Sequence, residues 1–431
     1  MLKKCLAVAA MCALLVSARP LAAEKIDLDQ GLDLKGVLES LQAETAPTPA
    51  VSALEGRIPI PEWTVMVYVN AKNNLEQFGL ADVNEMEEVG STDKVKIVVE
   101  LGRIAGYDGT DGNWVGQRRY VIRKDNNPKK ISSLPLEKIP KADMGDWRHL
   151  VDFVKWAKAT APAKHYVLVV WNHGSGWSKM SADKLPNDAW IQGISYDDET
   201  GNHMTTPDMR LAMEKIGKVD IFASDACLMQ MAEVGYQIKD YADYIVASEE
   251  TEPGDGYTYD KFLGPLAAKA DMSSLDLARL MAQAYTQHYA EINQAAQQSV
   301  VRAAALPQLL SKLTAWTVLA MNGKNGDKIK AAVSHAQSFA YNDNKDLLHF
   351  IQLVDSSAKD TSLKRYSAEL ENFIANEVVM GNNATGDKLA NAKGLAIYLP
   401  GYGYNKDYDE LTWAKDGGWS VFLKWLKDIK R

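Results

Sequence analysis

A single cysteine, Cys227, follows an apolar run that ends in the segment Ser224-Asp-Ala-Cys227. The chain's other cysteines, Cys5 and Cys12, lie in an N-terminal stretch that has the pattern of a removable export signal. A lone thiol in an exported protein cannot form a disulfide within its own chain. Cys227 is therefore expected to be an inert buried residue, a link between chains or a reactive nucleophile.

A histidine, His173, lies in the corresponding position after another apolar run, residues 166–171, and is followed by Gly174. This abrupt change from apolar strand to glycine-rich loop exposes the imidazole and lets a substrate approach the backbone. A thiolate attacks a carbonyl carbon, and an imidazole protonates the leaving amine and then activates water. The pair predicts a Cys/His hydrolase, with the N–H groups of Gly174 and Cys227 stabilising the oxyanion.

Both residues also have simpler interpretations. Cys227 can be a buried structural cysteine, and His173 can be a hydrogen-bonded histidine that ends a strand. We expect a helix over residues 228–238, whose first N–H groups favour a thiolate at Cys227. The remaining histidines occupy helical or polar settings without this context: His149, His165, His203, His288, His335 and His349.

Asp225 precedes the cysteine by two positions, which places both side chains on one face of an extended strand. A carboxylate beside a thiolate disfavours the thiolate, so Asp225 is expected to have another role. It can cap the following helix, or it can line a pocket for a cationic substrate side chain. Asp255, in a Pro-Gly-Asp-Gly turn, is a second residue suited to the wall of such a pocket.

Residues 174–205 are rich in Gly, Ser and Asp, and we predict a long loop with a small hairpin near residues 193–196. Asp197, Asp198 and Glu199 cluster within it. A solvated acidic loop explains them more simply than a metal site, and their spacing is not that of an EF-hand. No metal site is assigned.

Residues 1–23 combine basic residues, a short apolar run and small residues, which is the pattern of a secretory signal peptide. Residues 24–61 lack a strong strand pattern and are expected to be a prosegment or linker before the folded part, residues 62–431. Loss of the signal removes three basic residues and no acidic one, so the net charge falls from −8 to −11. An acidic surface argues against nucleic acid or anionic lipid as the main partner. No other segment is long and apolar enough to cross a membrane.

Apolar strands alternate with helices in the first half of the folded part, which predicts an α/β fold with a mostly parallel sheet covered on both faces. Ligands of such sheets bind beyond the carboxyl ends of the strands, where His173 and Cys227 lie. A helix after the first strand is expected to be capped by Asn73, with Glu76 as the reciprocal partner. The expected strands are residues 63–69, 95–101, 117–123, 166–171, 219–224 and 244–248, with 299–306 and 394–399 extending the same sheet. A catalytic core over about 62–265 is followed by a helix-rich part over about 266–431, with helices at 273–294, 306–321, 326–338, 345–357, 362–380 and 419–429.

Several segments in a fixed order resemble the clostripain family of cysteine peptidases, which belongs with caspases, gingipains, legumains and separase. The resemblance covers the chain from about residue 62 to its C-terminus. The matching segments are Trp63-Thr-Val-Met-Val-Tyr with Asn73-Asn-Leu-Glu76, Trp171-Asn-His173-Gly-Ser-Gly-Trp177 and Ser224-Asp-Ala-Cys227-Leu-Met, together with residues 249–257 and 394–400.

The resemblance implies a caspase-like fold, a His173/Cys227 dyad and cleavage after Arg or Lys in protein or peptide substrates. It implies that Asp225 lies in the S1 pocket, which receives the residue before the cleaved bond, with Asp255 beside it. Family members can cleave themselves in the loop after the histidine, where Lys179 and Lys184 are the expected sites. Some relatives depend on calcium, but no calcium motif is matched here and no cofactor is assigned.

Two other functions remain open from the sequence. The same dyad can serve another amide hydrolase or a transpeptidase, and mass spectrometry of the products separates these from an endopeptidase. A non-catalytic binding protein on this fold predicts that Cys227 resists labelling by Arg or Lys chloromethyl ketones. The export signal places the protein in the periplasm or outside the cell.

Overall fold

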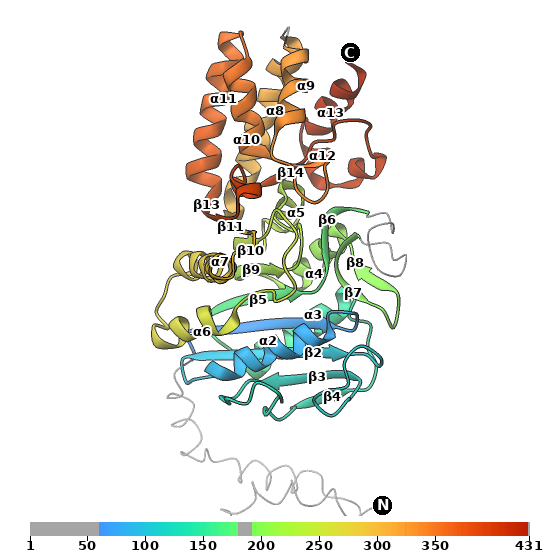
Figure 1. Ribbon diagram of the computed structural model, residues 1–431, viewed down its shortest axis with the longest axis vertical. Coiled ribbons are helices and arrows are strands. Elements are labelled where there is room, and N and C mark those ends of the chain that lie inside the picture. The colour runs from blue at the N-terminus through green and yellow to red at the C-terminus, as the bar shows by residue number, and fades with distance from the viewer. Residues whose placement is uncertain (1–59, 180–191, 324, 430–431) are drawn as a thin grey trace, which may run out of the picture. The chain divides into compact units, whose positions relative to one another are not determined.

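The computed structural model describes residues 60–179, 192–323 and 325–429 (Figure 1). The predicted signal peptide, nearly all of the predicted prosegment and Lys184 lie outside the described residues. Within those described ranges, no helix is both long and apolar enough to span a membrane.

A nine-stranded sheet runs through the described chain in the order β13-β11-β10-β9-β5-β1-β2-β3-β4. The middle strands β2, β1, β5, β9 and β10 are parallel, and antiparallel strands extend the sheet on both sides. This confirms the predicted fold class. The strands are β1 (Trp63–Ala71), β2 (Val95–Arg103), β3 (Gly116–Val121), β4 (Glu137–Ile139), β5 (His165–Trp171), β9 (Val219–Asp225), β10 (Ala242–Ala247), β11 (Ala296–Arg302) and β13 (Val379–Thr385).

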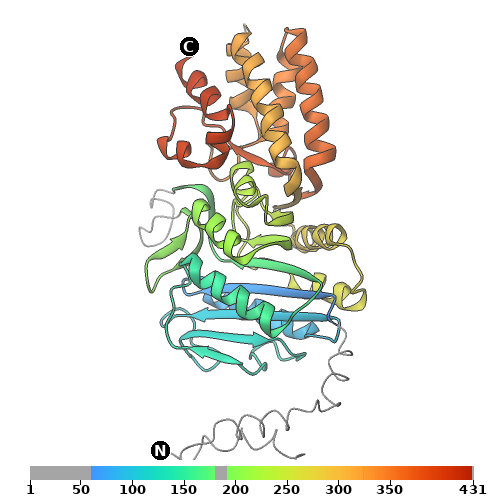
Figure 2. The same cartoon turned by 180° about the vertical axis from the view of Figure 1, so that it is seen from behind.

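Helices cover both faces of this sheet, as the all-apolar strands require. Successive side chains of a strand point to opposite faces, and in β1 Met66 and Tyr68 join one buried cluster while Val65 and Val67 join another. One face carries α2 (Glu76–Val89), α6 (Tyr259–Ala268) and α7 (Ser274–Glu291). Figure 2 shows the opposite face, with α3 (Trp147–Thr160) and α4 (Thr206–Ile216) lying across it, and α5 (Ala232–Ile238) packs into the same cluster.

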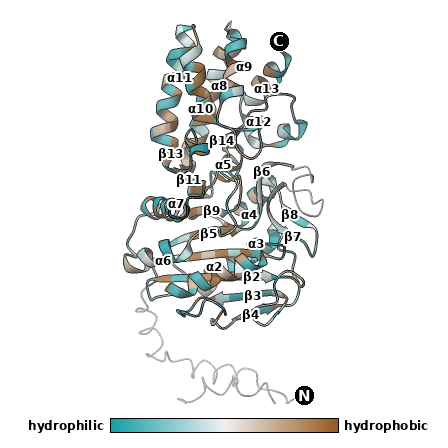
Figure 3. Cartoon of the chain, viewed as in Figure 1, coloured by the Kyte–Doolittle hydropathy of each residue, from teal (hydrophilic) through white to brown (hydrophobic). Residues whose placement is uncertain are grey.

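The C-terminal part is mostly helical, as predicted, and its apolar residues join the buried cluster on the α5 side of the sheet. Trp316 packs edge-on against Phe350 and Phe422, and Trp419 completes this aromatic core. In Figure 3 its helices show alternating hydrophobic and hydrophilic stripes, as expected for helices with one buried face. The helices are α8 (Leu306–Asn322), α9 (Gly326–His335), α10 (Leu347–Ser357), α11 (Thr361–Phe373), α12 (Thr412–Asp416) and α13 (Trp419–Asp428).

One prediction for this part is wrong. Residues 394–399 do not extend the central sheet, because β14 (Ala396–Tyr398) pairs with β12 (Asn344–Asp346) in a separate antiparallel pair. The helix predicted over 362–380 is present as α11 continued by a π-helical turn (Ile374–Val378). The chain then enters β13, which was not predicted and forms the edge of the central sheet beside β11.

In the region predicted as a long loop, the described residues include a three-stranded sheet: β6 (Gly174–Lys179), β7 (Gln192–Asp197) and β8 (Asn202–Met204). Asp197 is buried rather than solvated, contrary to prediction. Its carboxylate accepts a hydrogen bond from the buried Lys72 ammonium at 2.8 Å, and Glu199 also pairs with Lys72. This ion pair fixes the small sheet to the end of β1.

The predicted cap of α2 is also wrong in detail. The Asn73 side chain accepts a hydrogen bond from the Leu75 N–H at 2.9 Å, and the helix begins at Glu76. Glu76 does not reach back to Asn73, because its carboxylate pairs with the buried guanidinium of Arg103 at 2.7 Å. The cap instead holds Asn74 at the start of α2, close to the end of β5.

Candidate active site

Cys227 and His173 come together because β5 and β9 are parallel neighbours in register. Trp171 pairs with Asp225 at the last step of the ladder, and each candidate residue follows its strand by two positions. Parallel strands lie about 4.8 Å apart, so side chains that leave the same edge in the same register share one rim. The register of two buried strands therefore determines where the two groups meet.

Both residues line one cavity of about 120 Å³ together with Asp225 and Glu252. That volume is roughly four times the volume that one molecule occupies in liquid water, so the cavity suits a single side chain rather than a whole ligand. The other lining residues are Leu75, Trp171, Asn172, Ala226, Pro253, Gly254 and Gly256. The cavity is therefore a narrow pocket directly beside the thiol.

Cys227 is half-buried, and its sulfur accepts a hydrogen bond from the Glu252 N–H at 3.2 Å. Burial and then the nearby Glu252 carboxyl raise the pKa of the thiol to about 12. The expected stabilisation by a helix N-terminus is wrong, because α5 begins only at Ala232 and Leu228 adopts a left-handed φ of 63°. The resting sulfur is thus a neutral thiol.

His173 is oriented by a residue that the sequence reasoning missed. Its Nε2 lies 2.7 Å from Oδ1 of Asn74, which can only accept a hydrogen bond. Nε2 therefore carries the hydrogen and Nδ1 has the lone pair. Burial lowers the pKa of this imidazole to about 4, so it is neutral at physiological pH. Among the described residues, no hydrogen bond joins His173 to Cys227, and the resting pair is an imidazole and a thiol.

Gly174 lies against the backbone of the cysteine. A Cβ atom built on Gly174 would stand 2.4 Å from the carbonyl oxygen of Cys227 and 3.2 Å from its nitrogen. Any larger residue would push the two segments apart. The absence of a side chain lets the main chains of the two candidate segments pass side by side.

Asp225 is buried at the inner end of the cavity. Its Oδ2 accepts hydrogen bonds from the Tyr257 N–H at 3.3 Å and the Tyr259 hydroxyl at 2.9 Å. Burial raises the pKa of this carboxyl to about 6. Because the carboxylate bonds to residues after β10, it does not cap α5, and of the two predicted roles only the pocket position is compatible with the structure.

Three further carboxyl groups that the sequence reasoning missed surround Asp225. Glu252 lies in the cavity wall, and burial followed by the charge of Asp225 raises the pKa of its carboxyl well above the usual value. Asp82 accepts from the Trp171 indole at 2.6 Å, and Glu85 accepts from the Tyr259 N–H at 3.0 Å. Burial raises both pKa values, that of Glu85 to about 8.

None of these four carboxyl groups forms an ion pair with a cationic side chain within the described part of the chain: Asp82, Glu85, Asp225 and Glu252. Buried carboxylates without a counter-ion are costly and raise one another's pKa values. The sequence does contain a signal for one of them. Asp82 occupies an inward position of α2 beside Val83 and Met86, where an apolar residue is the usual choice.

The structure does not bring Asp255 into this cavity. Its side chain is 63% exposed, and His288 lies 4.0 Å from it on the outer surface.

Lys179 is the last residue of β6. Across the ranges that the structure describes, no group of three or more His, Cys, Asp or Glu side chains is arranged to hold a metal ion.

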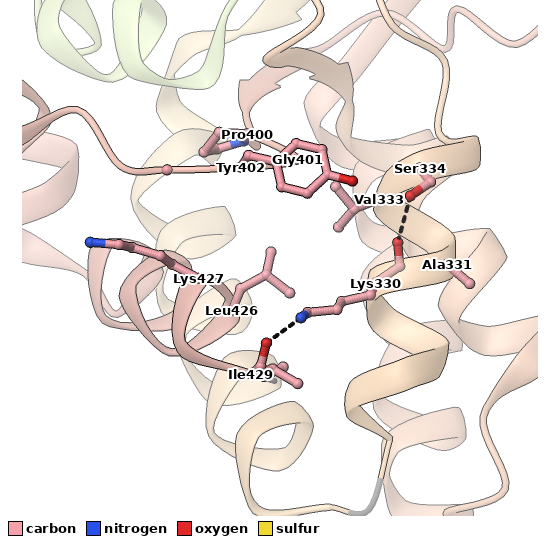
Figure 4. Close-up of a pocket in the computed structure, with 11 residues that line it drawn as sticks. Lys330, Ala331, Val333, Ser334, Pro400, Gly401, Tyr402, Leu426, Lys427 and Ile429 are labelled. Atoms are coloured by element: carbon pink, nitrogen blue, oxygen red, sulfur yellow. Dashed lines mark hydrogen bonds between the residues drawn. The ribbon is translucent and has the colours of Figure 1, made fainter. Parts of the chain in front are cut away.

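A larger cavity of about 420 Å³ lies elsewhere, between α9, α13 and the turn around Gly401 (Figure 4). The Lys330 ammonium crosses its floor and donates to the carbonyl of Ile429, which ties the two helices together. Its lining contains neither a thiol, a histidine nor a carboxylate. The candidate catalytic residues therefore line the smaller cavity and not this one.

Comparison with known proteins identifies the family of this chain. A family model described as "Peptidase_C11: Clostripain family" matches residues 67–427. Clostripain of Hathewaya histolytica is 30% identical over 237 residues, which are 49% of this chain and 44% of that protein, so the match spans under half of that relative.

Solved structures share the fold. A secreted C11 cysteine protease from Bacteroides thetaiotaomicron, in complex with an irreversible peptide inhibitor, is 20% identical, with a TM-score of 0.63 over 84% of this chain and 99% of that one. An inactive zymogen C11 protease from Parabacteroides distasonis is 19% identical, with a TM-score of 0.61 over 83% of this chain and 98% of that one. Since the family match extends over most of the sequence and includes both candidate catalytic segments, this chain belongs to the clostripain family of cysteine peptidases.

Proposed function

We propose that this chain is an exported cysteine endopeptidase that cleaves peptide bonds after Arg or Lys. Cys227 is the nucleophile, His173 is the acid and base, and Asp225 selects a basic side chain. The observation that carries the proposal is the narrow cavity beside the thiol, which is lined by buried carboxyl groups that have no cationic partner among the described residues. A Lys or Arg side chain supplies the missing positive charge.

The first chemical step begins from a neutral pair. The lone pair at His173 Nδ1 accepts the thiol proton as the Cys227 sulfur attacks the peptide carbonyl carbon. The imidazolium then protonates the leaving amine, and an acyl-enzyme remains. Neutral His173 next removes a proton from water as the water oxygen attacks the thioester carbon. The C–S bond then breaks, the imidazolium returns its proton to the departing sulfur, and the new carboxylic acid leaves and loses its proton to solvent. Asn74 keeps the imidazole in the tautomer that these transfers need.

The oxyanion of each tetrahedral intermediate is stabilised by the N–H groups of Gly174 and Cys227. The support for this role is the close approach of the two backbones: a Cβ atom built on Gly174 would lie only 3.2 Å from the Cys227 nitrogen. Donors fixed in place before the reaction contribute about 3–4 kcal/mol each to such intermediates.

We also propose that the chain is exported and processed. Residues 1–23 are a signal peptide, 24–61 a prosegment or linker, and 62–431 the peptidase domain, which gives a secreted or periplasmic enzyme. The similar protease from Bacteroides thetaiotaomicron is a secreted protein, which agrees with export. Self-cleavage after Lys179 or Lys184 is proposed as well. Fragment analysis of the wild-type protein beside Cys227→Ala reports signal removal, prosegment loss and self-cleavage together.

Active-site labelling tests the proposal. A peptidyl-Arg chloromethyl ketone should add once per chain at Cys227, and its norleucine counterpart, which lacks the positive charge, should react at least about tenfold more slowly. Asp225→Asn should abolish that preference while the thiol still reacts with iodoacetamide. Labelling without a basic preference in the wild-type protein would overturn the assigned specificity.

A further inference from the structure

Two carboxyl groups face each other at the inner end of the cavity. The side chains of Asp225 and Glu252 are within hydrogen-bonding reach of one another. The other hydrogen bonds of Asp225 all reach Oδ2, and Gln298 donates to Oε1 of Glu252 at 2.9 Å. Oε2 of Glu252 is buried and receives no hydrogen bond from an N–H or hydroxyl donor in the described chain. One oxygen of each carboxyl is thus left for the other.

Such a pair holds one proton between two oxygens. Two carboxylates in contact cannot both be ionised without a large electrostatic penalty, so they share a hydrogen. The elements packed around the pair supply acidic and phenolic groups, not basic ones: Asp82 and Glu85 of α2, Tyr257, Tyr259 of α6, Tyr285 and Tyr289 of α7, and the more distant Asp255 and Cys227. His173 lies on the cavity rim and is neutral.

We propose that Glu252 is a second specificity-determining carboxyl beside Asp225, and that a basic substrate side chain replaces the proton that the two share. This inference rests on the proposed preference for Arg or Lys. In the exchange the shared O–H bond breaks, the proton leaves to solvent, and the ammonium or guanidinium donates hydrogen bonds to both carboxylates. The charge of the pocket is the same before and after binding, which limits the cost of burying an ion pair.

The pocket is open for this exchange because of Gly256. Its φ of 59° lies in the left-handed region, and a Cβ built there would stand 2.9 Å from Oδ1 of Asp225. A side chain at position 256 would therefore cover the oxygen that the proposal assigns to the substrate. Glycine leaves that oxygen accessible from the cavity.

Glu252 also links the pocket to the nucleophile. Its N–H donates to the sulfur of Cys227, while its carboxyl meets Asp225. A side chain seated between the two carboxyls is held directly beside the attacking atom. This geometry favours Glu252 over the exposed Asp255 as the partner of Asp225.

The exchange makes substrate affinity depend on pH with a defined sign. As the pH falls, the pair becomes more fully protonated, and a cation must displace more protons to bind. KM for a basic substrate should therefore rise as the pH falls through about 6, where Asp225 titrates. A substrate with norleucine in place of Arg should show no such rise, because it carries no charge to exchange.

Steady-state kinetics and calorimetry on the full chain test the inference. Glu252→Gln should raise KM for a peptidyl-Arg reporter by about tenfold or more, the scale of one lost hydrogen bond to a charged group. Cleavage of the norleucine reporter should fall far less than cleavage of the Arg reporter. Iodoacetamide labelling of Cys227 should not slow, because loss of the Glu252 charge removes one cause of the raised pKa of the thiol. Glu252→Asp, which restores a titrating group, should recover the pH dependence. Glu250→Gln is the matched control, because Glu250 belongs to the same segment but does not line the cavity.

Titration of wild-type protein with acetyl-arginine amide in buffers of different ionisation enthalpy counts the protons released. We expect about one proton per ligand near neutral pH in the wild type and about none in Glu252→Gln. Equal proton release in both proteins would overturn the inference, as would a loss of Arg affinity in Asp255→Asn but not in Glu252→Gln. Both results leave cleavage after Arg or Lys intact, whereas failure of the wild type to cleave such reporters defeats the proposed function itself.

Discussion

The backbone N–H of Glu252 donates a hydrogen bond to the sulfur of Cys227 at 3.2 Å, across 25 residues of sequence. This bond fixes the thiol against the segment that closes the cavity. The nucleophile and the wall of the specificity pocket are therefore parts of one small arrangement.

The thiol is expected to be unreactive until substrate is bound. Burial raises the pKa of Cys227 to about 12 and lowers that of His173 to about 4, so the thiolate fraction grows as the pH rises toward the thiol value. The rate of alkylation by iodoacetamide without substrate should increase about tenfold for each pH unit between 6 and 9. A plateau that begins below pH 7 would show a resting thiolate–imidazolium pair and contradict this.

Asn74 is expected to act as a positioning residue for His173. Asn74→Ala removes the acceptor that fixes the tautomer, and kcat should fall by about tenfold or more while KM changes little. Asn74→Asp keeps an acceptor and adds a negative charge, so the acid limb of the kcat profile should move to higher pH. An unchanged kcat in the alanine variant, or an unmoved limb in the aspartate variant, would exclude the role.

Gly174→Ala should disturb the site because the new methyl group meets the Cys227 carbonyl. We expect a loss of about 1–3 kcal/mol in the free energy of unfolding and a fall in kcat of at least about 100-fold. Gly264→Ala is the matched control, since open space surrounds that position in α6 and alanine should stabilise the helix by about 0.5–1 kcal/mol. Denaturant unfolding and reporter kinetics measure both effects, and wild-type activity in Gly174→Ala would contradict the close passage.

Lys72→Met should strongly destabilise the small sheet beside the site. The substitution leaves the Asp197 carboxylate buried without its partner, which typically costs about 3–5 kcal/mol. The exposed pair of Lys164 and Glu62 provides a comparison, and Lys164→Met should cost less than about 1 kcal/mol. Equal urea midpoints for the two variants would refute a structural role for the buried pair.

Much of the fold follows from the sequence because its parallel strands are buried on both faces. The run 166–171 is apolar throughout and the run 63–69 is interrupted only by Thr64, and the structure places both at the centre of the sheet. His173 and Cys227 were identifiable because each follows such a strand, and parallel strands end at a common edge. The sequence did not predict the positions of β13 and β14 in their sheets. The residues of a strand do not show which other strand it will pair with.

The carboxyl groups around Asp225 could not be identified from the sequence, because they come together only in the folded chain. Asp82 and Glu252 lie far apart in the chain, and only the packing of α2 and the turn after β10 against the sheet edge brings them to Asp225. Asp255 belongs to the same turn and was predicted in the pocket, yet its side chain points to solvent. A turn's sequence does not reveal which of its acids faces inward.

Product analysis of a single test peptide tests whether Cys227 cleaves peptide bonds after Arg or Lys. The peptide contains one Arg, one Lys, one Asp and one Leu in separated, otherwise equivalent positions, and mass spectrometry identifies each cut after incubation with the purified full chain. Our account predicts cuts after Arg or Lys alone with the wild-type protein and none with Cys227→Ala folded to the same melting temperature. Cleavage by the alanine variant, or cuts by the wild type after the acidic or aliphatic residue, would contradict it.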